Sequence, residues 1–392
     1  MSIIKKQSEL HKEMVTWRHH IHKHPELSFK EELTSDYIAS VLEANDIEMH
    51  RGLAVTGIVA TIHGKKEGRV IGLRADMDAL PIQEKNDFRH KSVHDGKMHA
   101  CGHDGHSTML LGAAVHLKQN NNFSGTVHFI FQPAEEGGGS GRVMVEEGIF
   151  GKFPCEAVYG MHNWPGMAEG QFAVHDAAVM AANETLKISI KGKGGHAAMP
   201  DQCVDPVVIG AQIITALQSV VSRNVAPLDS AVVSITMVDA GFVSNVIPND
   251  MNLTGSLRYF STEVGVEVKA KIKKIVEGVS HSMGATATFS STPNYPATVN
   301  TPKHAELCAS AAAEVVGSKN VLRNEKPSMG SEDFSFLLNA SEGAYIWIGN
   351  GLIPEDGPSG GCMLHNTEYD FNDEILPLGS SYWVQLVQGI LK

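Results

Sequence analysis

Residues 98–106 of the chain read MHACGHDGH, which places one thiol, three imidazoles and one carboxylate beside two glycines. A run with helical spacing, residues 107–114 (STMLLGAA), follows directly. Thiols, imidazoles and carboxylates are ligands of borderline-soft cations, and a purely structural turn has no need of so many of them. We interpret this stretch as half of a metal site; the alternative is a turn that carries surface histidines.

The size and composition of the chain indicate a soluble protein with two domains. Its 392 residues exceed what one hydrophobic core usually supports, and 42% hydrophobic with 19% charged residues is ordinary for an α/β protein. The five cysteines are odd in number and scattered, so a disulfide framework is not expected. A reducing compartment suits them, and we expect a cytoplasmic protein.

The charge balance argues against nucleic acid and membranes as partners. The net charge is −12, from 44 acidic and 32 basic residues, and no Lys/Arg cluster is interleaved with aromatic residues. A protein that binds phosphates must supply positive charge. The sequence also contains no apolar run long enough to cross a bilayer, and residues 1–13 have no apolar signal-peptide core.

Strands and helices alternate in the first half of the chain. Helices are predicted at residues 5–24, 30–43, 107–118 and 143–147, and strands at 55–63, 70–78, 126–132 and 157–162. This alternation predicts βαβ units and a mostly parallel central sheet, so the fold class is α/β. The first helix carries His19, His20, His22 and His24, which we interpret as surface or packing residues.

Three of the predicted strands end in acidic residues or in a histidine. The carboxyl ends of parallel strands lie on one edge of a sheet, where functional groups collect. Convergence on one shared site is therefore expected. The side chains concerned are Asp76 and Asp78 after the first of these strands, Glu135 and Glu136 after the second, and His162 after the third.

The pattern changes at about residue 184 and returns at about residue 298. Between these points the predicted order is βαββαβ, the ferredoxin-like split motif. We therefore expect a first domain formed by residues 1–183 and 298–392, interrupted by an inserted α+β domain at residues 184–297.

Glu135 and Glu136 are adjacent and precede three glycines. Neighbouring side chains of an extended chain point apart, so one glutamate can bind a metal while the other holds a water beside it. Metal-assisted hydrolysis uses such a division, because a carboxylate outside the coordination shell moves the proton. The alternative is a solvated acidic turn.

Three further residues complete the predicted site. Asp78 is the candidate to orient a ligand histidine, although a strand-end cap explains it equally well. His162 and His365 each follow apolar residues into a turn, where a single histidine is often simply packed. Counted together with the other ligands, both become natural members of a metal site.

Five motifs in order along the chain carry a resemblance to a known family. They are RADMDALP (74–81), MHACGHDGH (98–106), FQPAEEG (131–137), GGHAAMP (194–200) and SEDF (331–334). Together they resemble the amidohydrolase branch of the di-metal aminoacylase and carboxypeptidase family. That branch includes hippurate hydrolases, N-acyl-amino-acid amidohydrolases and plant auxin-conjugate hydrolases.

The resemblance implies a metal-bearing catalytic domain interrupted by a smaller lid or dimerisation domain. It implies two divalent ions per subunit (Zn, Mn, Co or Ni), with Glu135 as general base. The wider family has a histidine two residues before its active-site aspartate and an aspartate that bridges the metals. Asp76 and Cys101 stand at these places here, and a thiolate favours softer ions. The implied ligands are Cys101, His103, Glu136, His162 and His365.

The resemblance also assigns roles to three residues of the inserted domain. His196 would stabilise the tetrahedral oxyanion, often in the site of a partner subunit, so a homodimer or higher homo-oligomer is expected. Asn245 and Arg258 match positions that hold the substrate, and a guanidinium suits an α-carboxylate. From the residues alone, the alternative for His196 is a histidine in a turn, and a structural ion pair explains Arg258 equally well.

The expected reaction is hydrolysis of the amide bond of an N-acyl or N-aroyl amino acid such as hippurate. A dipeptidase or aminopeptidase of the same family is the alternative, and it would have to recognise a free amine. A metal-binding protein without catalysis is a third possibility. Glu135 argues against it, because this carboxylate is surplus to a closed coordination shell.

Overall fold

The computed structural model describes residues 5–323, 325–353 and 362–392, and the chain divides into two compact units. The first unit comprises Met1–Val179, Val299–Lys326 and Asp333–Lys392, and the inserted unit comprises Met180–Thr298 with Pro327–Glu332. The short segment Pro327–Glu332 is assigned to the resumed first domain by sequence, but it packs with the inserted unit.

The first unit contains an eight-stranded sheet in the order β1-β2-β4-β3-β5-β16-β6-β15. Its four central strands, β4, β3, β5 and β16, are parallel, whereas β1, β2 and β4 pair antiparallel and β6 runs antiparallel to β16. The α/β fold class is confirmed, with a mixed sheet whose parallel part is its centre. The bounds are β1 (Glu48–Leu53), β2 (Gly57–His63), β3 (Lys66–Asp76), β4 (Ser124–Gln132), β5 (Ala157–Pro165), β6 (Phe172–Ala173), β15 (Val321–Leu322) and β16 (Glu342–Gly351).

The central strands are apolar along most of their length because both faces of the sheet are covered. β5 and the middle of β16 are buried almost without interruption, and the second half of β3 is buried as well. Continuous apolar runs of this kind are typical of parallel strands between helical layers. β1 is polar and largely exposed, as suits a strand at the edge of a sheet.

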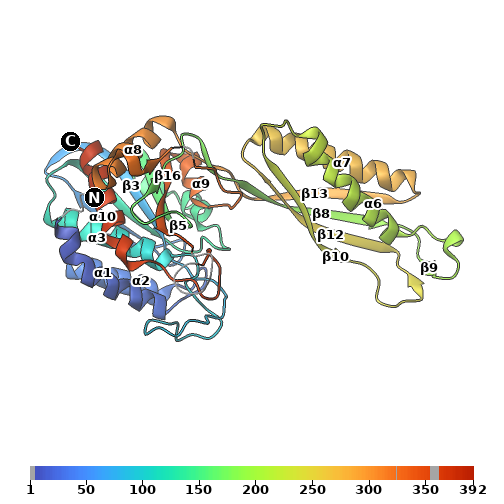
Figure 1. Ribbon diagram of the computed structural model, residues 1–392, viewed down its shortest axis with the longest axis horizontal. Helices are drawn as coiled ribbons and strands as arrows, with labels where there is room; N and C mark the ends of the chain where they lie inside the picture. Colours follow the sequence, from blue (N-terminus) through green and yellow to red (C-terminus); the bar gives the residue numbers. More distant parts are fainter. Residues whose placement is uncertain (1–4, 324, 354–361) are drawn as a thin grey trace. The chain divides into compact units, whose positions relative to one another are not determined.

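Helix α3 is the central helix of the first unit and packs against α1 and α10 (Figure 1). It is buried from His103 to Leu117. Gly112 allows the close approach, since a Cβ there would collide with Met14 of α1 and Ser380 of α10. The helices are α1 (Lys5–Lys23), α2 (Glu32–Ala44), α3 (His103–Gln119), α4 (Ser140–Glu146), α5 (Ile149–Lys152), α8 (Pro302–Val316), α9 (Phe334–Ala340) and α10 (Leu376–Ile390).

Three element boundaries differ from the sequence prediction and change where site residues lie. The helix predicted from residue 107 begins at His103, so the last residues of MHACGHDGH form its first turn. The strand predicted to end at His162 continues to Pro165, which places His162 inside β5. β3 ends at Asp76, and Asp78 follows it outside regular structure.

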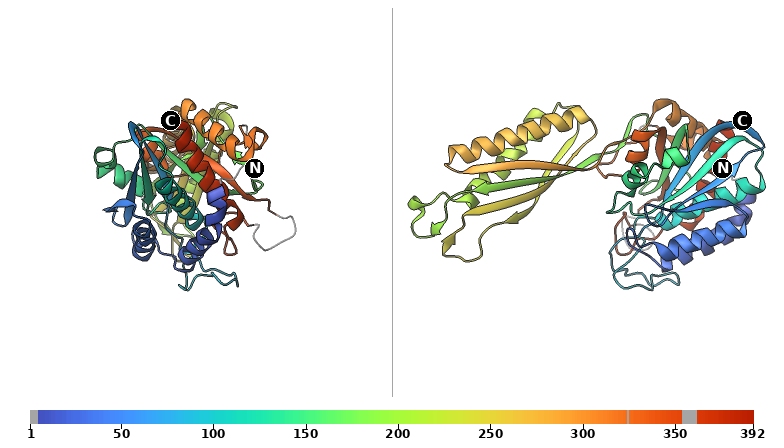
Figure 2. Two further views of the ribbon diagram at one scale, coloured as in Figure 1. Left: turned by 90° about the vertical axis from the view of Figure 1, so that its left-hand side faces the viewer. Right: turned by 180° about the vertical axis from the view of Figure 1, so that it is seen from behind.

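The inserted unit has the predicted βαββαβ order. Its antiparallel sheet runs β10-β12-β8-β13, and α6 and α7 cover one face (Figures 1 and 2). Alternate residues of β8 and β12 are buried against these helices, which gives the period of two seen in their sequences. The elements are β8 (Ala182–Lys191), α6 (Pro206–Ser219), β10 (Ala231–Asp239), β12 (Asp250–Tyr259), α7 (Thr262–Ser282) and β13 (Thr286–Tyr295), with a small ladder of β9 (Gly195–His196) and β11 (Val246–Ile247). The short paired strands β7 (Ala178–Met180) and β14 (Thr298–Val299) span the two boundaries between the units.

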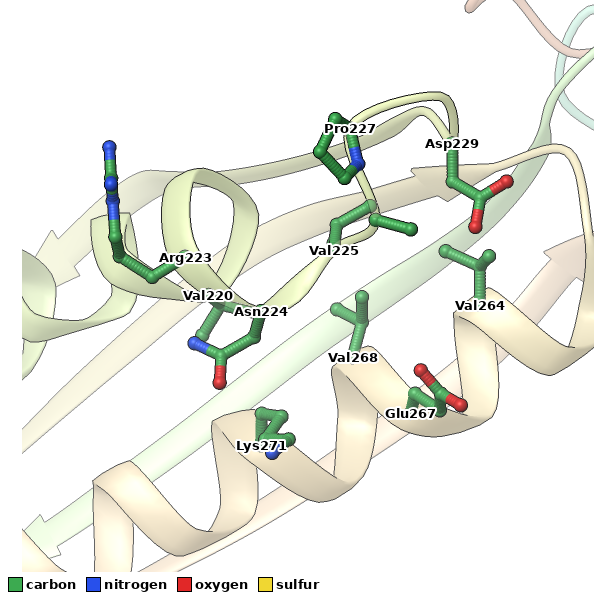
Figure 3. Close-up of a pocket in the computed structure, with 11 residues that line it drawn as sticks. Val220, Arg223, Asn224, Val225, Pro227, Asp229, Val264, Glu267, Val268 and Lys271 are labelled. Atoms are coloured by element: carbon green, nitrogen blue, oxygen red, sulfur yellow. The ribbon is translucent and has the colours of Figure 1, made fainter.

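Two features of the inserted unit lie apart from the predicted site. A hollow of about 340 Å³ separates residues 220–229 from α7, and it is lined by none of the predicted site residues (Figure 3). The helical stretch Pro206–Asn224 has the length and composition of a membrane span. Ile209, Ile213 and Leu217 of this stretch belong to the buried core of the unit, so one side of the helix packs inside the protein.

A buried ion network joins α1 to the start of α3 and to the C-terminal segment. The fully buried Arg18 contacts Asp370 at 2.8 Å and Asp104 at 3.1 Å, and it also pairs with Asp373. His22 bonds Asp104 through Nδ1 at 2.9 Å and Glu84 through Nε2 at 3.2 Å.

His22 is therefore a buried member of this ion network. Burial lowers its pKa, but the hydrogen bonds to Asp104 and Glu84 outweigh burial and raise the pKa to about 9. The sequence pattern does not distinguish it from its exposed neighbour His20, because the residues of α1 that face inward are selected by packing.

Replacement of the network's central cation should destabilise the first unit. We expect Arg18→Met to lower the free energy of unfolding by about 3 kcal/mol, because it removes the cation shared by three carboxylates and leaves the buried Asp104 with His22 as its remaining ion-pair partner among the described residues. The value lies at the lower end for buried ion pairs because Asp370 and Asp373 are partly exposed to water. Urea denaturation at a fixed metal concentration measures the change.

The matched control is Arg69→Met. Arg69 pairs with Glu156 at 2.8 Å, but both side chains are about half exposed, so the expected loss is below about 1 kcal/mol. Equal losses for the two variants would show that the Arg18 network does not stabilise the fold in this way.

Candidate metal centre

The five predicted ligands lie together in the first unit and form two sets. One set is Cys101, His103 and His162, and the other is Cys101, Glu136 and His365. Within each set the ligand atoms lie within 4.8 Å of one another. Cys101 is the member that both sets share, so its sulfur lies between the two groups of ligands.

A single glycine allows the Cys101 loop to turn into α3. Gly102 has φ of +104°, a conformation that L side chains rarely adopt. A Cβ at this position would also collide with the side-chain oxygen of Asn163. The glycine therefore permits both the turn and the close contact that place Cys101 and His103 on the same side of the loop.

The tautomers of two ligand histidines follow from their hydrogen bonds. His103 donates from Nδ1 to the main-chain and side-chain oxygens of Asp78, at 2.9 and 3.1 Å. His162 donates from Nδ1 to the Asn163 carbonyl at 2.7 Å, and its Nε2 lies 3.4 Å from the Cys101 sulfur. In both rings the Nε2 lone pair is left to face the ligand sets.

Asp78 holds more than one part of the centre in place. Besides the hydrogen bond from His103, it accepts a hydrogen bond from the main-chain nitrogen of Glu136 at 3.1 Å and one from Ser28 at 3.0 Å. A carboxylate that orients a ligand histidine and the loop of a ligand glutamate is typical of metal sites.

His365 reaches the centre from a strained loop. Its φ is +65°, which is uncommon for a residue other than glycine, and its main-chain nitrogen donates to Ala100 at 2.7 Å. Its Nε2 lies 3.2 Å from Glu136 Oε1, although these atoms form no hydrogen bond. The side chain is 51% exposed, so this side of the centre is open to solvent.

The electrostatics of the centre fit a pair of cations. Burial raises the pKa of the Cys101 thiol well above its usual value, and Glu136, Glu135 and Asp76 raise it further. Burial lowers the pKa of His103, but Asp76 and Asp78 outweigh it and raise the pKa to about 10. Nearby cations reverse such shifts, because they favour a thiolate and neutral imidazoles.

Two buried polar atoms in the ligand sets also indicate a missing partner. Nε2 of His103 and Oε1 of Glu136 have no hydrogen-bond partner among the described residues. Buried polar atoms are nearly always satisfied, so both fit a role as metal ligands. A thiolate, imidazoles and a carboxylate together suit borderline divalent ions such as zinc, cobalt or nickel.

Glu135 lies beside the ligand sets without belonging to the two that share Cys101. It is buried, and one of its oxygens lies within 4.8 Å of ligand atoms of His103 and Glu136. Its Oε1 accepts a hydrogen bond from the main-chain nitrogen of Asp333 at 3.4 Å. Asp333 is held by Arg74, Gln132 and the main-chain nitrogen of Gly141.

Asp76, which takes the place of the wider family's histidine, is committed to other partners. It accepts from Arg74 at 2.8 Å and from His106 at 2.6 Å. Burial raises its pKa, but His103 and Arg74 outweigh burial and hold the pKa well below its usual value. Asp76 is thus a charged neighbour of the centre. Its carboxylate oxygen lies close to ring nitrogens of His103 and His106 rather than in either ligand set that shares Cys101.

The sequence interpretation missed three members of this network. His106 bonds Asp76 and Asn163, and Asn163 contacts the hydroxyl of Tyr369 at 2.6 Å. His106 follows His103 by three residues in α3, a spacing that brings both rings to one face of a helix. That spacing was the available signal for His106, whereas nothing local indicates Asn163 or Tyr369.

The three other predicted site residues lie in the inserted unit. His196 is exposed and pairs across the β9–β11 ladder with Val246, and the carbonyl of Asn245 accepts from Ala197 at 3.1 Å. Arg258 donates to Met329 O at 2.9 Å and to Ser331 Oγ at 3.0 Å. Both acceptors are neutral, and among the described residues no carboxylate pairs with Arg258.

Comparison with known proteins identifies the family. Residues 72–389 match the family model of peptidase family M20/M25/M40. The chain is 37% identical over 392 residues to the hippurate hydrolase of Campylobacter jejuni, with 100% of both chains covered, and 38% identical over 384 residues to an N-acetylcysteine deacetylase of Bacillus subtilis, covering 97% of this chain and 98% of that one. The crystal structure of a Bacillus subtilis dinuclear metal-binding peptidase of the M20 family matches with a TM-score of 0.85 at 34% identity, over 98% of this chain and 99% of that one.

The dinuclear relative and the two ligand sets agree on the cofactor, which is a pair of divalent metal ions per subunit. The family match, the two relatives and the possible metal ligands all support the same class of enzyme. The protein is a metal-dependent amidohydrolase. The chain therefore belongs to peptidase family M20/M25/M40.

Proposed function

We propose that this protein hydrolyses the amide bond of N-acyl or N-aroyl amino acids, such as hippurate, and releases a carboxylic acid and a free amino acid. The observation that carries the proposal is the position of Glu135. This buried carboxylate lies next to the ligand sets but outside the two that share Cys101, where a general base for water must be.

The proposed roles follow from the chemistry of each group. The divalent ions, when bound, polarise the scissile carbonyl and lower the pKa of water. Glu135 accepts a proton from the attacking water at a carboxylate oxygen and delivers it to the leaving nitrogen. Asp78 acts through His103, whose ring it orients by two hydrogen bonds. The proposed metal ligands are Cys101, His103, Glu136, His162 and His365.

The inserted unit supplies the remaining groups in this proposal. Arg258 binds the substrate carboxylate, which is supported by its lack of a carboxylate partner among the described residues. Asn245 holds the substrate, and the exposed His196 donates to the developing oxyanion, in the same chain or in a partner subunit. A guanidinium that is bonded to neutral acceptors and an exposed imidazole are both suited to a ligand that arrives from solution.

The relatives favour an N-acyl amino acid over a peptide with a free amine. Hippurate and N-acetylcysteine, the substrates in the names of the two relatives, are both amino acids whose nitrogen is acylated. Their acyl groups differ in size, so the proposal is limited to the class of substrate. The free cysteines at all five positions support a reducing, cytoplasmic location.

We also propose that the inserted unit forms a homodimer through strand β10. β10 lies at the edge of its four-stranded sheet, and edge strands offer unpaired main-chain groups to a second chain. Met237 and Val238 near its end are 64% and 60% exposed, and Phe242 beyond it is 91% exposed. Apolar side chains next to an open edge are typical of an interface.

Removal of the proposed base should abolish turnover without loss of metal. We expect Glu135→Gln to lower kcat by about 10²–10⁴-fold, the usual contribution of general base catalysis. Metal content, measured by elemental analysis, should stay at the wild-type value. Glu136→Gln is the matched variant and should instead lose bound metal, because it removes a ligand. Full activity of a metal-loaded Glu135→Gln enzyme would refute the role.

A substrate panel tests the proposed class. Hippurate and N-acetyl and N-indoleacetyl amino acids should be cleaved by enzyme reconstituted with zinc, manganese, cobalt or nickel, whereas N-benzoylglycinamide and free dipeptides should be poor substrates. Arg258→Met should raise KM for hippurate by roughly 10–100-fold, as expected for a charge-assisted hydrogen bond. Preference for free dipeptides would identify a dipeptidase instead.

The proposed dimer predicts a change of mass on substitution of the edge strand. Light scattering should give twice the chain mass for the wild type and a single chain mass for Met237→Lys with Val238→Lys, because buried lysines at the interface oppose association. Val266→Lys is the matched control, since Val266 is 58% exposed on α7. A monomeric wild type, or a double variant that still dimerises, contradicts the proposal.

A further inference from the structure

A buried glutamate outside the predicted site contacts the turn that leads from β4 into the metal centre. Glu31 lies directly before α2 and is fully buried, yet its carboxylate makes no cap hydrogen bond to that helix. Instead, its Oε1 accepts hydrogen bonds from the main-chain nitrogens of Ala134 at 2.9 Å and Phe29 at 3.0 Å. Its Oε2 accepts one from the Thr56 hydroxyl at 2.7 Å. Glu31 therefore ties its own loop to two other segments of the first unit.

Both nitrogens that donate to Oε1 belong to residues with a strained main chain. Ala134 has φ of +50° and Phe29 has φ of +62°, a region that residues other than glycine rarely adopt. Such conformations persist only where the surrounding contacts impose them, and they gather at functional sites. By accepting from both nitrogens, one carboxylate oxygen of Glu31 helps to impose both conformations.

The conformation of Ala134 directs the two glutamates that follow it, the proposed base and a proposed ligand. The Ala134 carbonyl accepts hydrogen bonds from the main-chain nitrogens of Gly138 at 3.2 Å and Ser140 at 3.3 Å, which closes the turn around both glutamates. The Phe29 ring packs against this turn, since a Cβ on Gly138 would collide with it. The hydrogen bond from Ala134 to the Glu31 carboxylate therefore restrains the start of the turn.

The loop that joins α1 to α2 also contacts the segment that carries Asp78. Ser28 donates to Asp78 at 3.0 Å, and the main-chain nitrogen of Ala79 donates to the Glu26 carbonyl at 2.8 Å. Asp78 is the carboxylate that orients the His103 ring. The same loop thus contacts two of the segments that support the metal centre.

We propose that Glu31 is a positioning residue of the metal centre, which through Ala134 places Glu136 for metal binding and Glu135 for proton transfer. The part that concerns Glu135 rests on the function proposed above. The part that concerns Glu136 depends only on the ligand set to which it belongs. Removal of a group that holds a ligand from outside the coordination shell typically lowers metal affinity or activity by about 10–100-fold.

The three hydrogen bonds do not require a charged side chain at residue 31. A glutamine oxygen can accept from both main-chain nitrogens, and its amide nitrogen can donate to the Thr56 hydroxyl. Burial and the charge of Asp78 also raise the pKa of Glu31 to about 7, although its hydrogen bonds oppose the rise. Methionine has a similar size but offers no such acceptor. Glu31→Gln should therefore keep the turn in place, whereas Glu31→Met should release it.

Zinc affinity and steady-state kinetics of the zinc-loaded holoenzyme test the proposal. We expect Glu31→Met to raise the zinc dissociation constant, measured by competition with a chelator, and to lower kcat for hippurate, each by about 10–100-fold. KM should stay near the wild-type value, because the groups proposed to bind the substrate carboxylate lie in the inserted unit. Glu31→Gln should restore zinc affinity and kcat to near the wild-type values.

Two further variants complete the test. Thr56→Val removes only the hydroxyl that holds Oε2, so it should fold and weaken zinc binding by a smaller factor than Glu31→Met. Glu184→Met is the matched control, because Glu184 is a buried carboxylate of the inserted unit that accepts from Tyr259 and Lys269, both at 2.6 Å. It should lower the melting temperature and leave zinc affinity unchanged.

The proposal is overturned if neither Glu31→Met nor Thr56→Val weakens zinc binding, or if Glu31→Gln is as impaired as Glu31→Met. The second result would assign the effect to the charge of Glu31 and not to its hydrogen bonds. The zinc measurement needs no substrate, so it tests the placement of Glu136 whatever the enzyme cleaves. A weakened zinc site in an enzyme that does not cleave hippurate would contradict the proposed function and still support the role of Glu31.

Discussion

The structure of the first unit depends on the convergence of a thiol and several carboxylates in a buried space. Cys101 and the adjacent Glu135 and Glu136 come from two separate loops, and burial together with the two glutamates opposes the thiolate form of Cys101. Such a cluster is stable only if positive charge compensates it. A pair of divalent cations held by the two ligand sets would supply that charge.

The carboxylates around this centre are divided between two kinds of cation. Arg74 pairs with Asp76 and Asp333, and Arg18 pairs with Asp104 and with two aspartates of the C-terminal segment. These guanidinium groups neutralise the outer carboxylates within the protein itself. Among the described ion pairs, no arginine contacts the thiol or the carboxylate of the two ligand sets. These groups therefore remain available to bind metal. The carboxylates that pair with arginine and stabilise the fold are thus distinct from the carboxylate that is available to the metal centre.

The proposed metal ligands and the proposed substrate-binding groups lie in different units of the chain. Cys101, His103, Glu136, His162 and His365 all lie in the first unit, while Arg258, His196 and Asn245, for which substrate and oxyanion roles are proposed, lie in the inserted unit. Arg258 is positioned by Met329 and Ser331, which belong to the short segment that returns to the inserted unit late in the chain.

The sequence by itself determined the α/β order, the βαββαβ insertion and the residue types of the centre, because periodicity and motif spacing are local properties. Tertiary structure alone decided that Cys101 is shared by two ligand sets, that His162 lies inside β5, and that Arg18 and His22 of α1 are buried while His20 is exposed. These outcomes depend on partners distant along the chain, such as Arg18 and Asp373, which are 355 residues apart. No local pattern encodes such a contact, since it exists only after the helices and the sheet have packed together.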